Sequence, residues 1–173
     1  VPSIASHPNI VVLRTFSKAW GMAGLRVGMA FADVAIIELM NRVKPPYNVS
    51  GIAQRVVLEA LRSDKQIDQW IEQAILERQR LAKELSGLAM VETVYPSDAN
   101  FLLVKTSDAA EIYKELIRTG IVVRDRSRVL LCEGCLRITV GTPEENDRLL
   151  ESLRSIGTGI SADEVLPILL GGI

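Results

Sequence analysis

The sequence predicts an α/β protein built from a partial large domain, a long linking helix and a small α/β domain. Residues 9–16 are a short β-branched run that is typical of a buried strand. Residues 64–86 carry apolar side chains at helical spacing, and strand and helix patterns alternate after them. We therefore expect three parts, followed by a tail that the patterns do not assign: residues 1–62, 63–87 and 88–157, and then 158–173.

The composition is that of an ordinary globular protein. Apolar residues make up 48% of the 173 residues, and 20 basic side chains nearly cancel 21 acidic ones. A net charge of −1 excludes a broad basic surface for nucleic acid. No apolar run approaches the roughly 20 residues of a membrane span, and two cysteines are too few for a disulfide framework. We expect a cytoplasmic protein without nucleic-acid or membrane partners.

The first part contains two expected strands and two expected helices. The strands are expected at residues 9–16 and 25–32, and the helices at residues 33–42 and 51–62. Asp33 can cap the first helix, and Pro45 and Pro46 stop it, because proline lacks the amide donor. Two strands make a poor sheet alone. We therefore expect part of this domain to be missing, or to be supplied by another chain.

The linking helix has start and stop signals. Ser63 and Gln66 have the spacing of a capping box, and Gly87 is expected to supply a left-handed cap at the end. About 23 residues make a helix of about 35 Å at 1.5 Å per residue. Because this exceeds the usual helix length, we expect the helix to join two domains.

The small domain alternates strands and helices. Strands are expected at residues 90–95, 100–105, 121–124 and 136–140, and helices at residues 108–118 and 143–156. Gly120 closes the first of these helices. Thr142, Pro143 and Glu145 start the second with an N-cap, a proline at the first helical position and a capping glutamate.

Lys18 lies where the first strand ends in a glycine-containing loop. A lysine amine becomes a nucleophile when its surroundings lower its pKa, and it then forms Schiff bases with carbonyl compounds and pyridoxal phosphate. Thr15 and Ser17 offer hydroxyls to a phosphate, and Arg26 offers a planar fork. The alternative is a surface lysine beside a structural arginine. Residue chemistry alone favours this alternative, because the spacing is not diagnostic.

Three motifs carry a resemblance to a known family. They are the lysine segment Thr15–Gly28, the segment Ser97–Val104 and the segment Gly134–Asn146. All three resemble segments of fold-type I pyridoxal-phosphate-dependent aminotransferases, and among these the histidinol-phosphate aminotransferases, in family order and spacing. The resemblance covers residues 10 to about 157. With it, a cofactor-binding Lys18 is favoured over a surface lysine.

The resemblance implies four residues for the cofactor, pyridoxal 5′-phosphate. Lys18 would hold the cofactor covalently and later move protons as acid and base. Arg26 matches the arginine that binds the cofactor phosphate in the family. Thr15 and Ser17 match the hydroxyls that flank this phosphate.

The resemblance implies three further residues for the substrate. Arg137 matches the arginine that holds the substrate's anionic end, and Arg124 matches a second arginine facing the same site. Asn100 matches a polar family position near it. A guanidinium recognises phosphate and carboxylate alike, so one site can serve both half-reactions. The structural alternatives are an ion pair on a strand for Arg137 and a turn cap for Asn100.

Cys132, Cys135 and His7 do not indicate a metal or redox site. The cysteines form a lone C-x-x-C pattern, which can be half a zinc site or a redox pair, but no second pair exists. His7 is the only histidine and is far from them in sequence. We expect two incidental thiols, a solvent-facing histidine and no metal.

The sequence departs from the family pattern before Lys18. The family places there an acidic residue for the pyridine nitrogen, an Asn and a Tyr, an aromatic stacking partner and a glycine-rich turn. None can be assigned in the few residues that precede Lys18. We therefore expect a C-terminal portion of the enzyme, inactive alone, with its cofactor site divided.

The leading hypothesis is transamination of histidinol phosphate with 2-oxoglutarate in histidine biosynthesis, by a homodimer. One alternative is another enzyme of the same fold, either an aromatic or broad-specificity aminotransferase or a phosphoamino-acid decarboxylase. The other alternative is a non-catalytic interaction or regulatory module that has kept the fold.

Overall fold

The computed structural model describes residues 1–62 and 64–157, which divide into two compact units. Unit 1 comprises Val1–Ile71, and unit 2 begins at Glu72, inside helix α4 (Asp64–Ser86). The expected capping-box residue Ser63 and the tail at residues 158–173 lie outside the described residues. Within the described ranges, no helix is both long and apolar enough to cross a membrane.

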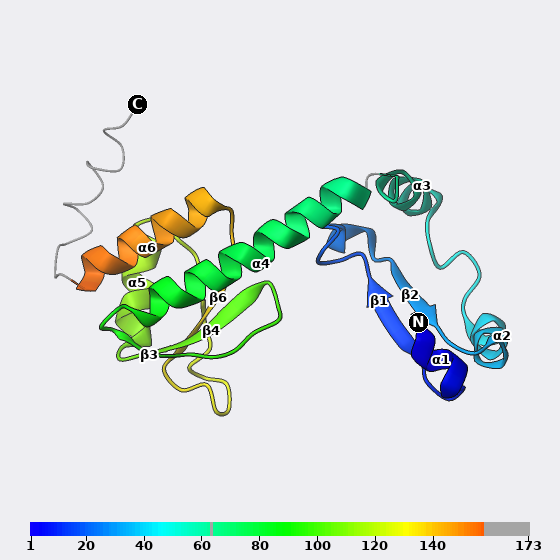
Figure 1. Ribbon diagram of the computed structural model, residues 1–173, viewed down its shortest axis with the longest axis horizontal. Coiled ribbons are helices and arrows are strands. Elements are labelled where there is room, and N and C mark those ends of the chain that lie inside the picture. Colours follow the sequence, from blue (N-terminus) through cyan, green and yellow to red (C-terminus); the bar gives the residue numbers. More distant parts are fainter. Residues whose placement is uncertain (63, 158–173) are drawn as a thin grey trace. The chain divides into compact units, whose positions relative to one another are not determined.

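Unit 1 is built around a two-stranded antiparallel sheet (Figure 1). Its elements are α1 (Pro2–Ser6), β1 (Val12–Thr15), the 3-10 helix η1 (Ala23–Leu25), β2 (Gly28–Phe31), α2 (Val34–Val43) and α3 (Gly51–Ala60). The strands pair from Val12 opposite Phe31 to Thr15 opposite Gly28. Both expected strands and both expected helices are present, although α2 is shifted by one residue and Leu25 lies in η1 instead of the second strand. The expected burial of the first strand is wrong, since β1 is largely exposed and Leu13 is 72% exposed. The short helix α1 was not expected, because five residues are too few to show a helical period.

Side-chain oxygens start the two longer helices of unit 1. Asp33 accepts a hydrogen bond from the amide of Ala35 at 2.9 Å, and Ser50 accepts one from the amide of Ala53 at 3.1 Å. Helix α2 ends at Val43, and the next residue is already extended, as expected before proline.

Unit 1 buries few apolar side chains. Phe16, Ala53, Val57 and Ile67 are buried, whereas α2 has no buried residue and leaves Val34 and Val43 71% and 83% exposed. In a complete domain, an apolar helix face packs against a neighbouring layer. Unit 1 is therefore part of a domain, as the sequence predicts.

Helix α4 has the expected length of 23 residues, but its end differs from the prediction. Gly87 does not have a positive φ, so the expected left-handed cap is wrong. Instead, the amides of Gly87 and Leu88 donate to the carbonyls of Glu84 and Leu85, at 3.2 and 3.1 Å. These bonds to the third residue back tighten the last turn and satisfy its carbonyl groups without a left-handed residue.

Unit 2 is a four-stranded antiparallel sheet covered by helices (Figure 1). The strands are β3 (Val91–Val94), β4 (Phe101–Thr106), β5 (Arg124–Asp125) and β6 (Cys135–Thr139), in the order β3-β4-β6-β5. The helices that follow strands are α5 (Ala109–Arg118) and α6 (Pro143–Gly157). The expected capping box of α6 is confirmed, because Thr142 and Glu145 exchange side-chain to amide bonds at 2.8 and 3.3 Å.

The strand expected at residues 121–124 is displaced, because β5 is only Arg124–Asp125. The amide of Ile121 donates to the carbonyl of Leu116 at 2.8 Å, and Gly120 has the left-handed φ of +75° expected of a helix end. The apolar residues after α5 therefore close the helix instead of pairing with the sheet.

One apolar cluster forms the core of unit 2. It joins α4, α5 and α6 to one face of β4 and β6, and its most buried members are Leu81, Leu85, Leu102, Val104, Leu116, Leu136 and Leu150. Burial alternates along β4, so Phe101 and Leu103 lie on the other face. By the same alternation, Arg137 lies on that face of β6.

A polar cluster lies beside this core. Glu77 accepts hydrogen bonds from Asn146 Nδ2 at 2.7 Å and from Arg80 Nη2 at 2.7 Å. Arg80 also donates to Asp147 at 2.6 Å. Glu77 is 9% exposed and Asn146 is 2% exposed. The bonds from Arg80 hold the pKa of Glu77 below its ordinary value, although burial acts in the opposite direction.

We expect Glu77 to make the folded chain sensitive to acid. Its pKa is lower in the folded state than its ordinary value of about 4.5, so its stabilising contribution is complete above that pH. The contribution is lost as the pH falls below about 4.5 and through the folded pKa. The melting temperature, measured from about pH 7 to about pH 3, should therefore fall less steeply in Glu77→Gln than in the wild type.

Glu72→Gln is the matched control, since Glu72 is an exposed glutamate of the same helix. It should keep the wild-type dependence on pH. An acid dependence that is identical in Glu77→Gln and the wild type would contradict this reading of the cluster.

Candidate active site

The loop after β1 presents Lys18. Phe16 is 3% exposed, and its ring meets Trp20 edge to face, with 5.6 Å between the centroids. The amide of Met22 donates to the carbonyl of Phe16, and the amide of Gly21 donates to the carbonyl of Lys18, both at 2.9 Å. These contacts fix the backbone of the loop, while Lys18 itself stays exposed.

The other three expected cofactor residues border the same loop. The amide of Ser17 donates to Thr15 Oγ1 at 2.9 Å. Arg26 has a left-handed backbone, with φ at 56°, and its Nη1 donates to the carbonyl of Ala23 at 3.0 Å. Residues other than glycine rarely adopt this conformation, and it is concentrated at functional positions. Thr15, Ser17, Lys18 and Arg26 thus all belong to the end of β1 and its connection to β2.

The charge of this segment suits a phosphate. Residues 1–32 contain no acidic side chain, whereas Arg14, Lys18 and Arg26 are cationic. The segment offers an amine, two hydroxyls and a guanidinium, which together can hold a phosphate and react with an aldehyde. The donor set therefore fits pyridoxal phosphate.

In unit 2, strands β5 and β6 place two arginines directly opposite each other. Arg124 pairs with Arg137, so both side chains lie on the face of the sheet away from the core. The Arg137 guanidinium lies 5.0 Å from the centroid of the Phe101 ring. Its buried Nε has no hydrogen-bond partner among the described residues.

Neither Arg124 nor Arg137 forms an ion pair within the described part of the chain. The ion-pair role that the sequence left open for Arg137 is therefore not what the structure shows. Like charges on directly opposed residues repel each other, and an anion bound by both relieves the repulsion. The arrangement suits a phosphate or a carboxylate.

Asn100 is exposed and directly precedes β4. Its carbonyl accepts from the amide of Val140 at 3.0 Å, and its side chain makes no hydrogen bond within residues 1–62 and 64–157. Ser97 holds the turn instead, since its Oγ donates to the carbonyl of Phe101 at 2.7 Å and accepts from the amide of Ala99 at 3.1 Å. The turn-capping role left open for Asn100 thus falls to Ser97.

Cys132 and Cys135 enclose a turn that leads into β6. The amide of Cys135 donates to the carbonyl of Cys132 at 3.0 Å, and both thiols are free. Cys135 is 1% exposed, and this burial raises the pKa of its thiol. His7 is exposed, with Nδ1 2.9 Å from Ser6 Oγ. No group of three or more His, Cys, Asp or Glu side chains among the described residues could hold a metal ion.

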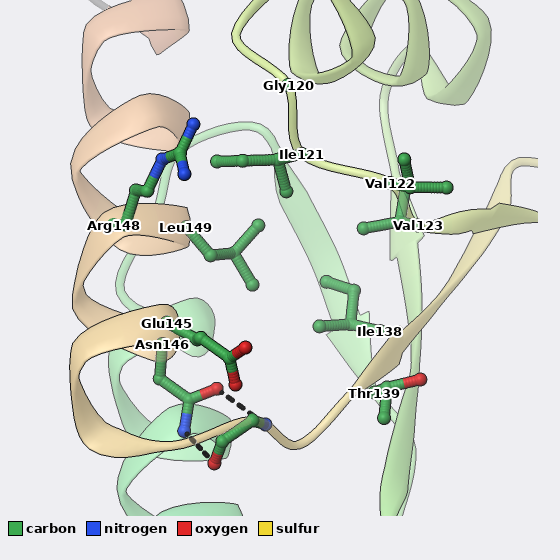
Figure 2. A pocket seen from close by; sticks show the side chains of 11 residues that line it. Gly120, Ile121, Val122, Val123, Ile138, Thr139, Glu145, Asn146, Arg148 and Leu149 are labelled. Carbon is green, nitrogen blue, oxygen red and sulfur yellow. Dashed lines mark hydrogen bonds between the residues drawn. The ribbon is translucent and has the colours of Figure 1, made fainter.

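Unit 2 also contains a cavity of about 320 Å³ that the sequence did not indicate (Figure 2). It lies between the segment after α5, the end of β6 and the first turns of α6, and its walls are both polar and apolar. Two of its polar side chains are already engaged, because Asn146 bonds to Gly141 and Arg148 donates to the carbonyl of Thr119 at 2.7 Å. None of the expected site residues lines it. The sequence did not indicate this cavity because residues 121–123, which line it, were expected to belong to a strand.

A model of the family "Aminotransferase class I and II" matches residues 1–153. The chain belongs to this family. It is 48% identical over 155 residues to a histidinol-phosphate aminotransferase of Cytophaga hutchinsonii, a match that covers 90% of this chain and 44% of that protein. The chain thus spans less than half the length of the curated relatives it matches.

Two solved structures resemble the chain over most of its length. A decarboxylase from Sulfurospirillum multivorans is 31% identical with a TM-score of 0.77, and the match covers 90% of this chain and 46% of that one. The histidinol-phosphate aminotransferase from Sinorhizobium meliloti, solved in complex with pyridoxal-5′-phosphate, is 26% identical with a TM-score of 0.71, covering 86% and 42%. The fold class implied by the sequence resemblance is confirmed.

We expect the pair Arg124 and Arg137 to reduce the stability of the chain. Replacing Arg124 with Gln removes the repulsion across the strands, and replacing it with Glu turns repulsion into attraction. The free energy of unfolding in urea should therefore rise in the order Arg, Gln, Glu, by roughly 0.2–1 kcal/mol in all. The gain should shrink at high salt. A stability lower in Arg124→Glu than in the wild type would contradict the assigned repulsion.

Proposed function

We propose that the chain is the C-terminal portion of a pyridoxal-phosphate-dependent aminotransferase that transfers an amino group between histidinol phosphate and 2-oxoglutarate, in histidine biosynthesis. The main support is the fixed loop that carries exposed Lys18 in a segment free of acidic residues, in a member of the class I and II aminotransferase family. Since the chain spans about 44% of its relatives, the activity is proposed for the longer protein.

Lys18, Arg26, Thr15 and Ser17 are the proposed cofactor residues. When bound, pyridoxal phosphate supplies an electron sink that stabilises negative charge on the substrate carbon. The Lys18 amine holds the cofactor and afterwards moves a proton at that carbon. The Arg26 guanidinium and the hydroxyls of Thr15 and Ser17 bind the phosphate. The exposure of Lys18 and Arg26 and the lack of nearby carboxylates in sequence support these roles.

Arg137, Arg124 and Asn100 are the proposed substrate residues. The guanidinium groups of Arg137 and Arg124 bind the phosphate of histidinol phosphate in one half-reaction and a carboxylate of the 2-oxo acid in the other. The Arg137 guanidinium and the Asn100 side chain form no hydrogen bond with any described residue. Neither group is therefore engaged elsewhere in the described part of the chain.

The organisation of the longer protein is also proposed. Residues 1–62 belong to the large cofactor-binding domain, residues 63–87 form the interdomain helix, and residues 88–157 form the small domain. The exposed apolar face of α2 supports an incomplete first domain. By the family resemblance, two copies form a homodimer, and the low cysteine count favours the cytoplasm.

A decarboxylase acting on a phosphoamino acid is the second candidate. The 31% identity to a decarboxylase from Sulfurospirillum multivorans favours it, because the fold and the arginine pattern serve both reactions. Turnover of histidinol phosphate with 2-oxoglutarate, compared with release of carbon dioxide from phosphoamino acids, decides between the two.

Lys18→Ala in the intact protein should abolish transamination and the visible absorbance of bound cofactor, because no other group replaces the amine. Lys18→Arg should also be inactive, since it keeps the charge and removes the nucleophile. Lys44→Ala, which changes an exposed lysine outside the loop, should retain activity. Circular dichroism checks folding. Normal turnover in folded Lys18→Ala would overturn the assignment.

Arg26→Ala should weaken cofactor binding. Loss of a charge-assisted bond costs about 1.5–3 kcal/mol, or roughly ten- to a hundredfold in affinity. A titration of the apoprotein with pyridoxal phosphate measures the change, and the KM for histidinol phosphate should move less. Arg42→Ala, which changes an exposed arginine of α2 outside the loop, is the control and should bind cofactor normally. Unchanged affinity in Arg26→Ala would make Arg26 a structural residue.

A further inference from the structure

Two consecutive residues of α4, Glu77 and Arg78, are connected to the two turns at one corner of the unit 2 sheet. Arg78 bonds directly to one turn, and Glu77 is connected to the other through Asn146 of α6. We propose that they are positioning residues, which hold Phe101 and Arg137 in the arrangement that binds the anion of the substrate. The proposal rests on the proposed function, because it takes Arg137 to bind that anion. Neither residue lies in the motifs that carry the family resemblance.

Glu77 acts on the turn between β6 and α6. Its Oε2 accepts from Asn146 Nδ2 at 2.7 Å. The Asn146 side chain bonds twice to Gly141, accepting from its amide at 3.0 Å and donating to its carbonyl at 3.1 Å (Figure 2). Because a carboxylate only accepts, Glu77 fixes which end of the Asn146 amide faces it. Asn146 then serves as the hydrogen-bonding partner that the Gly141 backbone lacks in the sheet.

The turn at Gly141 has little freedom to adjust. A Cβ atom there would lie 2.6 Å from Oε2 and 2.9 Å from Cβ of Glu145. The same Glu145 oxygen accepts from the amide of Thr142 at 2.8 Å at the start of α6. The turn is thus held on both sides, and it follows Arg137 closely along the chain.

Arg78 acts on the turn before β4. Its Nη1 donates to the carbonyl of Ala99 at 3.0 Å, and its Nη2 lies 3.8 Å from Asp98 Oδ1. The side chain of Arg78 is only 16% exposed, whereas Asp98 is fully exposed, so the bond to the backbone is the stronger constraint. Ala99 is two residues before Phe101.

The two turns meet at the corner of the sheet. The amide of Val140 donates to the carbonyl of Asn100 at 3.0 Å, and Phe101 pairs with Thr139. Because Glu77 and Arg78 are neighbours on one rigid helix, α4 holds the start of β4 and the end of β6 at a fixed separation.

This corner sets the direction of the Arg137 guanidinium. The group lies over the Phe101 ring at 5.0 Å, and its buried Nε has no partner in the described chain. The ring therefore fixes the orientation of the guanidinium, as a hydrogen-bond acceptor does for other arginines. A shift of the ring redirects the guanidinium, and its affinity for an anion falls with the loss of alignment.

The test measures anion binding at Arg137 and turnover separately, in the intact protein. The Nε–H NMR signal of Arg137, assigned with Arg137→Lys, is titrated with inorganic phosphate. Glu77→Ala and Arg78→Ala should each weaken phosphate binding at this signal about tenfold. Glu77→Gln and Arg78→Lys should recover much of the loss, because each keeps a bond to the same turn. Gln79→Ala is the control, since Gln79 is exposed between Arg78 and Arg80.

In turnover, the KM for histidinol phosphate should rise about tenfold in both alanine variants, with kcat changed less than about twofold. Unchanged phosphate affinity in a folded alanine variant overturns the proposal, as does an equal loss in Gln79→Ala. If Glu77→Ala does not fold, the Arg78 variants decide. The proposal is also overturned if the Arg137 signal of the wild type does not change when phosphate is added. Absence of wild-type transamination refutes only the proposed function, because the titration does not depend on turnover.

Discussion

The pairing of β4 with β6 is the constraint on which the rest of unit 2 depends. Leu103 lies opposite Arg137, and the residues on either side of each are buried against the helices. A slip of one residue would turn the guanidinium into the apolar core and Leu136 toward solvent. Burying an unpaired cation costs far more than any gain in pairing. The apolar packing of one face of the sheet therefore determines that Arg137 lies on the opposite face.

The sequence predicted best those elements whose apolar residues face a single partner layer. Helix α4 and strand β4 have clear periods, and their limits agree with the structure to within a residue or two. The errors arise where composition permits more than one backbone. Gly87 can adopt a left-handed cap, but the local bonds end the helix in another way. The run at residues 121–123 is apolar enough for a strand, yet its burial comes from packing after α5.

The candidate site was predictable only in part. Lys18 and Arg26 lie in one continuous motif, so a local pattern can indicate them. The polar cluster around Glu77 has no such pattern, because its partner Asn146 is 69 residues away in sequence. The pairing of Arg124 with Arg137 could not be predicted without the register of β5. This strand lies at the end of the segment that the sequence predicts as a strand. Long-range pairing of polar groups is what the sequence alone does not contain.

The opposed arginines also connect ligand supply with the lifetime of the protein. The folded state holds two arginines at opposed strand positions, whereas the unfolded chain lets them separate. An anion that binds only the folded state then stabilises it by RT ln(1 + [L]/Kd), through mass action. Under the proposed function, that anion is the substrate itself. Under that proposal, the folded protein is least resistant to proteolysis when its substrate is scarce.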